Sequence, residues 1–211
     1  MAEGSALRLN ELLSSAGLEP LQASVAGQFA EYLSLILKWN DRVNLTSIRD
    51  EEGILQRHFV ESIFCAQALP AGIQTLLDFG SGAGLPGIPI ALCRPEIAVT
   101  LAESQGKKAA FLREAARVLG VSVVVRTGRA ETLAGQFGCV TLRAVERMRE
   151  AVGTASQLVL PGGFMALMIG SADQAELRAA AAGFAWREGL ALSFSREGLL
   201  LIGEQSSGLQ R

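Results

Sequence analysis

The spacing of apolar residues changes near residue 75. In residues 21–40, apolar side chains recur every three or four positions, which predicts a helix with one buried face. That face comprises Val25, Phe29, Tyr32, Leu33, Ile36 and Leu37. A second helix is expected over residues 51–69, with Asp50 as its N-cap and Pro70 as its stop. We therefore expect a helical extension over residues 1–70 and a second domain over residues 71–211.

From Thr75 onward, short apolar runs alternate with helical patterns. Strands are expected at 75–79, 97–103, 121–128, 138–144 and 162–170, and helices at 87–93, 107–120, 146–158 and 172–183. These strands are apolar on both faces, as in a parallel sheet that helices cover on both sides. The last two runs, 186–195 and 198–204, are joined too tightly for a helical crossover and predict an antiparallel hairpin. The result is an α/β fold with a seven-stranded, mostly parallel sheet.

Composition narrows the class of protein. The chain has 211 residues, 49% of them apolar, which is enough for a buried core. Its net charge of −2 argues against a protein that coats nucleic acid through bulk charge. No apolar run could span a bilayer, and the N-terminus lacks a secretory signal pattern, so we expect a cytoplasmic protein. We expect the tail, residues 204–211, to be frayed.

Cysteine and histidine offer little for a metal site. Cys65, Cys93 and Cys139 are far apart in apolar runs, so we expect buried, unpaired thiols. The single histidine, His58, is expected to pack within a helix rather than transfer protons. We predict no bound metal.

A glycine-rich loop follows the first predicted strand, where doubly wound sheets bind ligands. Gly80, Gly82 and Gly84 let the backbone approach a ligand closely. Glu103 stands 25 residues after Asp78, at the end of the second strand, where a carboxylate can accept hydrogen bonds from both ribose hydroxyls. To this point a dinucleotide and S-adenosylmethionine fit equally well.

Three details favour S-adenosylmethionine. The dinucleotide fingerprint needs a third glycine where this chain has Leu85. Asp78 would repel a pyrophosphate but suits the ammonium group of a methionine moiety. Glu131 follows the third strand where an adenine would lie, and its neighbour Ala130 keeps that pocket narrow.

Several blocks resemble one family of enzymes. They are LKWNDRVNLTSIRD (37–50), RHFVES (57–62), DFGSGAGLPGIPIALCRPE (78–96), ESQGKKAAFLR (103–113), RAE (129–131) and RA (143–144). The chain thus resembles the bacterial small-subunit ribosomal RNA (guanine-N7) methyltransferases, also called the glucose-inhibited division protein B family. The resemblance implies a class I, Rossmann-like methyltransferase fold. It also implies methyl transfer from S-adenosylmethionine to N7 of one guanine in 16S rRNA.

The resemblance also implies roles for particular residues. Cofactor contacts carry over to Gly80, Leu85, Ala130, Glu131 and Arg143, and Glu103 matches the ribose-binding acid of the class. One position departs from the family, which commonly has Lys where this chain has Ile169. A positive contact to RNA could therefore be missing there.

The chemistry needs no general base, because guanine N7 carries a lone pair and no proton. We therefore predict no acid–base catalytic residue, only alignment of the reacting atoms. Candidate RNA contacts are Arg42, Arg49, Arg57, Lys107 and Lys108. The expected partner is 16S rRNA or the 30S subunit, with no membrane or DNA partner, and we expect a monomer.

Other functions remain open at this point. A small-molecule methyltransferase would use the same cofactor residues. An adenosine-binding regulator would bind the cofactor without methyl transfer, and an NAD-dependent oxidoreductase is a third alternative.

Overall fold

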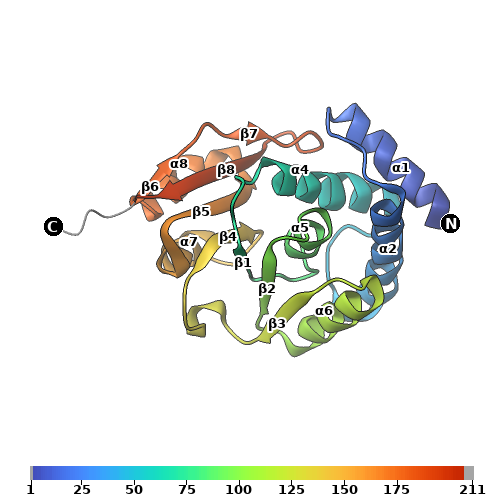
Figure 1. Cartoon of the computed structure of the whole chain (residues 1–211), viewed down its shortest axis with the longest axis horizontal. Helices are drawn as coiled ribbons and strands as arrows, with labels where there is room; N and C mark the ends of the chain where they lie inside the picture. The colour runs from blue at the N-terminus through green and yellow to red at the C-terminus, as the bar shows by residue number, and fades with distance from the viewer. Residues whose placement is uncertain (1, 207–211) are drawn as a thin grey trace.

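The computed structural model describes residues 2–206 (Figure 1). The helical extension comprises α1 (Ala2–Ser15), α2 (Ala23–Val43), α3 (Glu51–Gly53), the π-helical segment η1 (Ile54–Val60) and α4 (Glu61–Ala68). The predicted helices are confirmed, and the Asp50 carboxylate caps α3 by accepting a hydrogen bond from Gly53 N at 2.7 Å.

Strands and helices alternate from Thr75 to Ala180, as predicted. The strands are β1 (Thr75–Phe79), β2 (Ala98–Glu103), β3 (Val123–Thr127), β4 (Phe137–Arg143) and β5 (Val159–Gly170). The helices are α5 (Gly87–Cys93), α6 (Gly106–Leu119), η2 (Ala130–Thr132), α7 (Met148–Ala155), η3 (Ser156–Leu158), η4 (Ser171–Asp173) and α8 (Gln174–Ala180). Gly120 ends α6 in the left-handed conformation that glycine favours.

The end of the sheet differs from the prediction. Three strands, β6 (Phe184–Trp186), β7 (Leu190–Ala191) and β8 (Gly198–Gln205), replace the expected hairpin of two. Trp186 pairs with Gly203 and Leu190 pairs with Leu200. The segment from Trp186 to Leu190 therefore has one residue more than the part of β8 that it faces. The extra residue forms a bulge that splits the expected strand 186–195. The described sheet therefore has eight strands rather than seven.

The strand order is β3-β2-β1-β4-β5-β8-β6, with β7 also paired to β8. Neighbours from β3 to β5 run parallel, and β8 is antiparallel to β5, β6 and β7. Glu204 and Gln205, expected to fray, belong to β8, while residues 207–211 of the expected frayed tail lie outside the described residues.

Helices cover both faces of the sheet (Figure 1). On one face the extension packs with α5 and α6, and Tyr32 of α2 stacks between Phe59 and Phe111 at centroid distances of 5.2 and 6.4 Å. On the other face α7 and α8 pack against alternate residues of the same strands, such as Leu77 and Leu142. Cys65 and Cys139 are buried and Cys93 half-buried, all unpaired as predicted. Within residues 2–206, no helix combines the length and apolar character needed to cross a bilayer.

Candidate active site

The glycine loop between β1 and α5 is held from two sides. Ser81 N donates to Ala102 O of β2 at 2.9 Å, and the Tyr32 hydroxyl of α2 donates to Ala83 O. A Cβ atom on Gly84, whose φ is +85°, would lie 2.8 Å from the Tyr32 hydroxyl. The helical extension therefore shapes this loop directly.

Asp78 supports the loop but does not reach the pocket. Its carboxylate is 1% exposed and accepts hydrogen bonds from Gly87 N at 3.2 Å and Thr141 Oγ1 at 2.9 Å. Burial raises the pKa of Asp78 to about 6, although these hydrogen bonds oppose the shift. The expected contact between Asp78 and a ligand ammonium does not fit this placement, because the carboxylate is buried and lines none of the cavities around the loop.

Glu103 is the carboxylate that faces the pocket. It is 5% exposed; its Oε2 accepts from Gly82 N at 2.8 Å and its Oε1 from Gln105 N at 2.7 Å. Each carboxylate oxygen has two acceptor positions, so both can still accept from a ligand hydroxyl. Beside it, a Cβ atom on Gly82 would meet only Gly80 O, at 3.9 Å, so the loop leaves open space here.

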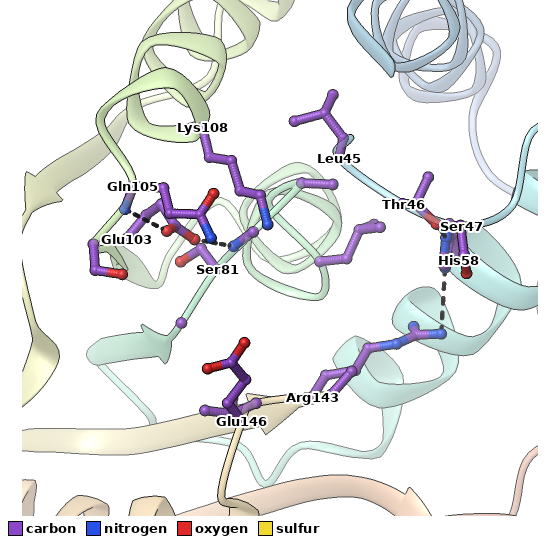
Figure 2. Close-up of a pocket in the computed structure, with 17 residues that line it drawn as sticks. Leu45, Thr46, Ser47, His58, Ser81, Glu103, Gln105, Lys108, Arg143 and Glu146 are labelled. Carbon is purple, nitrogen blue, oxygen red and sulfur yellow. Dashed lines mark hydrogen bonds between the residues drawn. The ribbon is translucent and has the colours of Figure 1, made fainter. Parts of the chain in front are cut away.

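Two cavities adjoin this loop, and a third cavity adjoins the first of them. The first, of about 440 Å³, lies between the glycine loop, Glu103 and the segment 45–47 (Figure 2). The second, also about 440 Å³, contains Ala130 and Glu131 and shares Gly80 and Val145 with the first. The third, of about 520 Å³, lies beside the end of β5. It shares these lining residues with the first: Ser47, His58, Arg143, Ala144 and Val145.

Arg143 bridges the end of β4 to the helical extension. Its Nη2 forms an ion pair with Glu61 Oε2 at 2.7 Å and also donates to Arg57 O, while its Nη1 donates to Ser62 Oγ at 3.3 Å. Glu61 also pairs with Arg57 Nε at 3.2 Å. Arg143 therefore lies at the junction of the first and third cavities with much of its charge neutralised.

The segment after α2 is fixed by Asn40. This side chain is 3% exposed, accepts from Thr46 N at 2.9 Å, and donates to Thr46 O at 2.9 Å and Ile48 O at 3.3 Å. Asn44 ends α2 in the left-handed conformation. The KWN and NLTS blocks of the sequence thus build one wall of the first cavity.

His58 lies between the first and third cavities (Figure 2). Its Nε2 is 2.6 Å from Thr46 Oγ1, and its Nδ1 is 3.4 Å from Arg143 Nη2. Burial, reinforced by the charge of Arg143, lowers the pKa of His58 to about 3. The imidazole is therefore neutral at physiological pH.

The structure brings most predicted cofactor residues together. Gly80, Gly82, Leu85, Glu103 and Arg143 line the first cavity, and Ala130 and Glu131 line the second. The RNA candidates are more scattered. Lys108 reaches over the first cavity from α6, and Arg57 lines the third, whereas Arg42, Arg49 and Lys107 are exposed outside all three.

Sequence reasoning missed several residues that line the cavities. They are Thr46, Ser47, Gln105, Glu146, Asp173 and Glu197. The NLTS block was the available signal for Thr46 and Ser47. The acidic pair Asp173 and Glu197 comes from two segments that only the pairing of β5 with β8 brings together. Ile169, at the departure from the family pattern, lines the third cavity beside this pair.

Comparison with solved structures shows the fold. The chain is similar to a ribosomal protein L11 methylase from Lactobacillus delbrueckii subsp. bulgaricus, with 13% identity and a TM-score of 0.60 over 71% of this chain and 79% of that one. It is also similar to an O-methyltransferase family protein from Burkholderia thailandensis, with 17% identity and a TM-score of 0.58 over 86% and 72%. The class I methyltransferase fold is therefore confirmed.

Sequence comparison shows the family. A ribosomal RNA small subunit methyltransferase G from Roseiflexus sp. (strain RS-1) is 47% identical over 141 residues, which cover 64% of this chain and 58% of that protein. Its namesake from Stenotrophomonas maltophilia (strain K279a) is 39% identical over 191 residues, covering 89% and 88%. The sequence model described as rRNA small subunit methyltransferase G matches residues 26–197. By its sequence, this chain belongs to the rRNA small subunit methyltransferase G family.

Proposed function

We propose that the chain transfers a methyl group from S-adenosylmethionine to N7 of a guanine in 16S rRNA. The observation that supports this most is the buried Glu103 carboxylate beside an open glycine loop, where two nucleoside-sized cavities adjoin. Family membership supports the same reaction.

The residues present fit the cofactor. Glu103 has free acceptor positions for two ribose hydroxyls, and Ala130 and Glu131 line a cavity that suits a purine. The open face of Gly80 and Gly82 suits the amino-acid part. We assign Asp78 to holding the loop instead of to ligand contact.

When bound, S-adenosylmethionine supplies an electrophilic methyl group on a sulfonium. The chain's own residues then have to align N7 with that methyl group and exclude water, which in the best intramolecular cases lowers a barrier by ~7–11 kcal/mol. No side chain needs to remove a proton, because N7 carries none. The guanine becomes positively charged during transfer, and a free cation against it would oppose the reaction.

We propose that the target base enters where the third cavity meets the first. Arg57 and Arg143 lie there and share the single carboxylate of Glu61, which compensates one of their two positive charges. Asp173 and Glu197 add negative charge to the third cavity. This environment suits a purine that gains positive charge.

We further propose that the enzyme acts as a cytoplasmic monomer on 16S rRNA or the 30S subunit, and not on DNA or at a membrane. Lys108 and Arg57 would contact RNA near the base, while the exposed Arg42, Arg49 and Lys107 would contact phosphates farther away.

The test is methyl transfer from labelled S-adenosylmethionine to 30S subunits that lack the modification, to free 16S rRNA, and to a metabolite extract. Digestion of the RNA should release labelled 7-methylguanosine. Label only in small molecules would overturn the RNA assignment, and tight cofactor binding without transfer would indicate a regulator.

A variant pair tests the cofactor site. Glu103→Gln should weaken S-adenosylmethionine binding, measured by calorimetry, by at least about tenfold, because hydrogen bonds to a charged group are lost. Glu96→Gln, which changes an exposed glutamate paired with Arg94, should bind like the wild type.

A further inference from the structure

The amino-acid part of the proposed cofactor carries an ammonium group, which needs an acceptor in the protein. The residue that the sequence predicted for it, Asp78, is buried and lines none of the three cavities. Glu103 is occupied in another way, because both of its oxygens accept backbone hydrogen bonds and their remaining positions suit the ribose. The ammonium group is therefore left without a partner among the predicted cofactor residues.

The other acidic side chains around the cavities differ in which cavity they line. The third cavity, which contains no residue of the glycine loop, has Glu61, Asp173 and Glu197 in its lining. Glu131 and Glu150 line the second cavity but not the first. Among the acidic residues in these linings, Glu146 is the one that the first and second cavities share.

Glu146 lies where the two cavities proposed for the cofactor meet. The residues common to both linings are Gly80, Ser104, Val145 and Glu146. A cofactor with its adenine in the second cavity and its amino-acid part in the first has to pass these residues. Figure 2 shows the Glu146 side chain pointing from the segment after β4 into the first cavity.

The backbone holds Glu146 in this position. Ala144 and Arg147 have φ angles of 49° and 51°, in the left-handed region that residues other than glycine rarely adopt. Between them, Val145 packs on the glycine loop, since a Cβ atom on Gly80 would lie 3.2 Å from Val145 Cγ2. Such residues persist where the surrounding structure fixes them, and they are frequent at ligand sites. The segment after β4 is therefore fixed against the loop.

The Glu146 carboxylate is available to a ligand. It is exposed and has no hydrogen-bond or ion-pair partner within the part of the chain that the structure describes. A carboxylate only accepts hydrogen bonds and an ammonium group only donates them, so the two are complementary. Lys108 and Arg143 add positive charge to the first cavity. The lining thus carries both signs of charge, which suits an amino-acid zwitterion.

We propose that the Glu146 carboxylate binds the ammonium group of S-adenosylmethionine, the role that the sequence predicted for Asp78. Methyl transfer removes the positive charge on sulfur and leaves the ammonium group unaltered, so this contact is the same before and after the reaction. Glu146 is therefore a cofactor-binding residue that takes no part in the transfer step. This inference rests on the proposed function.

The test is calorimetry with three nucleosides that differ in their charged groups. S-adenosylmethionine has an ammonium group and a sulfonium, S-adenosylhomocysteine keeps the ammonium group but has a neutral sulfur, and 5′-methylthioadenosine lacks both. Glu146→Gln should bind the first two about tenfold more weakly than the wild type, because a hydrogen bond between charged groups is lost. Its affinity for 5′-methylthioadenosine should be unchanged.

Two further variants complete the comparison. Glu146→Asp keeps the carboxylate and should lose less affinity for S-adenosylmethionine than Glu146→Gln does. Glu188→Gln removes an exposed carboxylate outside the three cavities and should bind all three nucleosides like the wild type. At saturating cofactor, kcat for methyl transfer should be the same in Glu146→Gln and the wild type, because the lost contact contributes equally to the ground state and the transition state.

The outcomes separate the two proposals. Equal affinity of Glu146→Gln and the wild type for S-adenosylhomocysteine would overturn the inference. A loss confined to S-adenosylmethionine would place the carboxylate at the sulfonium, and an equal loss for 5′-methylthioadenosine would place it at the nucleoside, so both results overturn it as well. A wild type that binds S-adenosylmethionine but methylates neither 30S subunits nor 16S rRNA contradicts the proposed function and leaves the result on Glu146 standing.

Discussion

The neutral state of His58 makes a quantitative prediction about stability. The pKa of His58 is about 3 in the folded protein, against 6.5 for an unperturbed histidine. The unfolded chain therefore binds a proton that the folded protein rejects, and the stability gained from the neutral ring is lost as pH falls below 6.5 toward 3. Between about pH 8 and about pH 5 the linkage relation gives a loss of about 2 kcal/mol in the free energy of unfolding.

This figure depends little on the exact folded value, since any folded pKa below about 4 gives nearly the same loss at about pH 5. Asp78 acts in the opposite direction. Its folded pKa of about 6 is raised from 3.8, so it contributes stability as pH falls through 6. Over the same range that contribution is about 1 kcal/mol. A comparison with a His58 variant removes it, because Asp78 is present in both proteins.

The assay is urea denaturation of wild type and His58→Gln at both pH values. The stability difference between the two proteins should shift by about 2 kcal/mol in favour of the variant on acidification. His58 is the only histidine in the chain, so a single Cε1–H resonance reports its titration directly. An unchanged stability difference, or a resonance that titrates near pH 6.5, would refute the reasoning.

Three further predictions concern the glycine loop and the RNA surface. Gly82→Val should abolish cofactor binding, because its side chain would occupy open space beside Glu103 and its φ of +55° disfavours a branched residue; unchanged affinity by calorimetry would mean the site is elsewhere. Tyr32→Phe leaves Ala83 O without its donor and should lower the free energy of unfolding by about 1–3 kcal/mol in urea denaturation, whereas an unaltered midpoint would show that the bond contributes nothing. Arg42→Glu or Arg49→Glu should weaken RNA binding and reduce its salt dependence while leaving cofactor affinity unchanged; equal RNA affinity at several salt concentrations would identify these arginines as ordinary surface residues.

Much of the fold could be predicted because it follows from local periodicity. The apolar runs at Thr75–Phe79 and Ala98–Glu103 and the glycine at 120 each act over a few residues, and their structures are those expected. The break between Trp186 and Leu190 could not be predicted in this way. It arises from register against β8, a strand that follows it in the sequence.

The site was also predictable only where it follows from local sequence. Glu103 and the glycines stand at strand ends, where a parallel sheet gathers functional groups. Asp78 also stands at a strand end, but its orientation toward Thr141 and Gly87 depends on packing that spacing does not encode. Thr46 and His58 meet because η1 packs against the segment after α2. The spacing of apolar residues does not predict this contact between two segments.

The clamp formed by Asn40 has a consequence for how the chain can vary in length. Surface loops usually accept insertions and deletions, because closing a slightly longer loop costs little entropy. Here one side chain binds Thr46 through both backbone groups and Ile48 through its carbonyl. Adding or removing a single residue between positions 40 and 46 would break this set of bonds and move Thr46 away from His58. The stretch from 41 to 45 should therefore tolerate changes of side chain far better than changes of length.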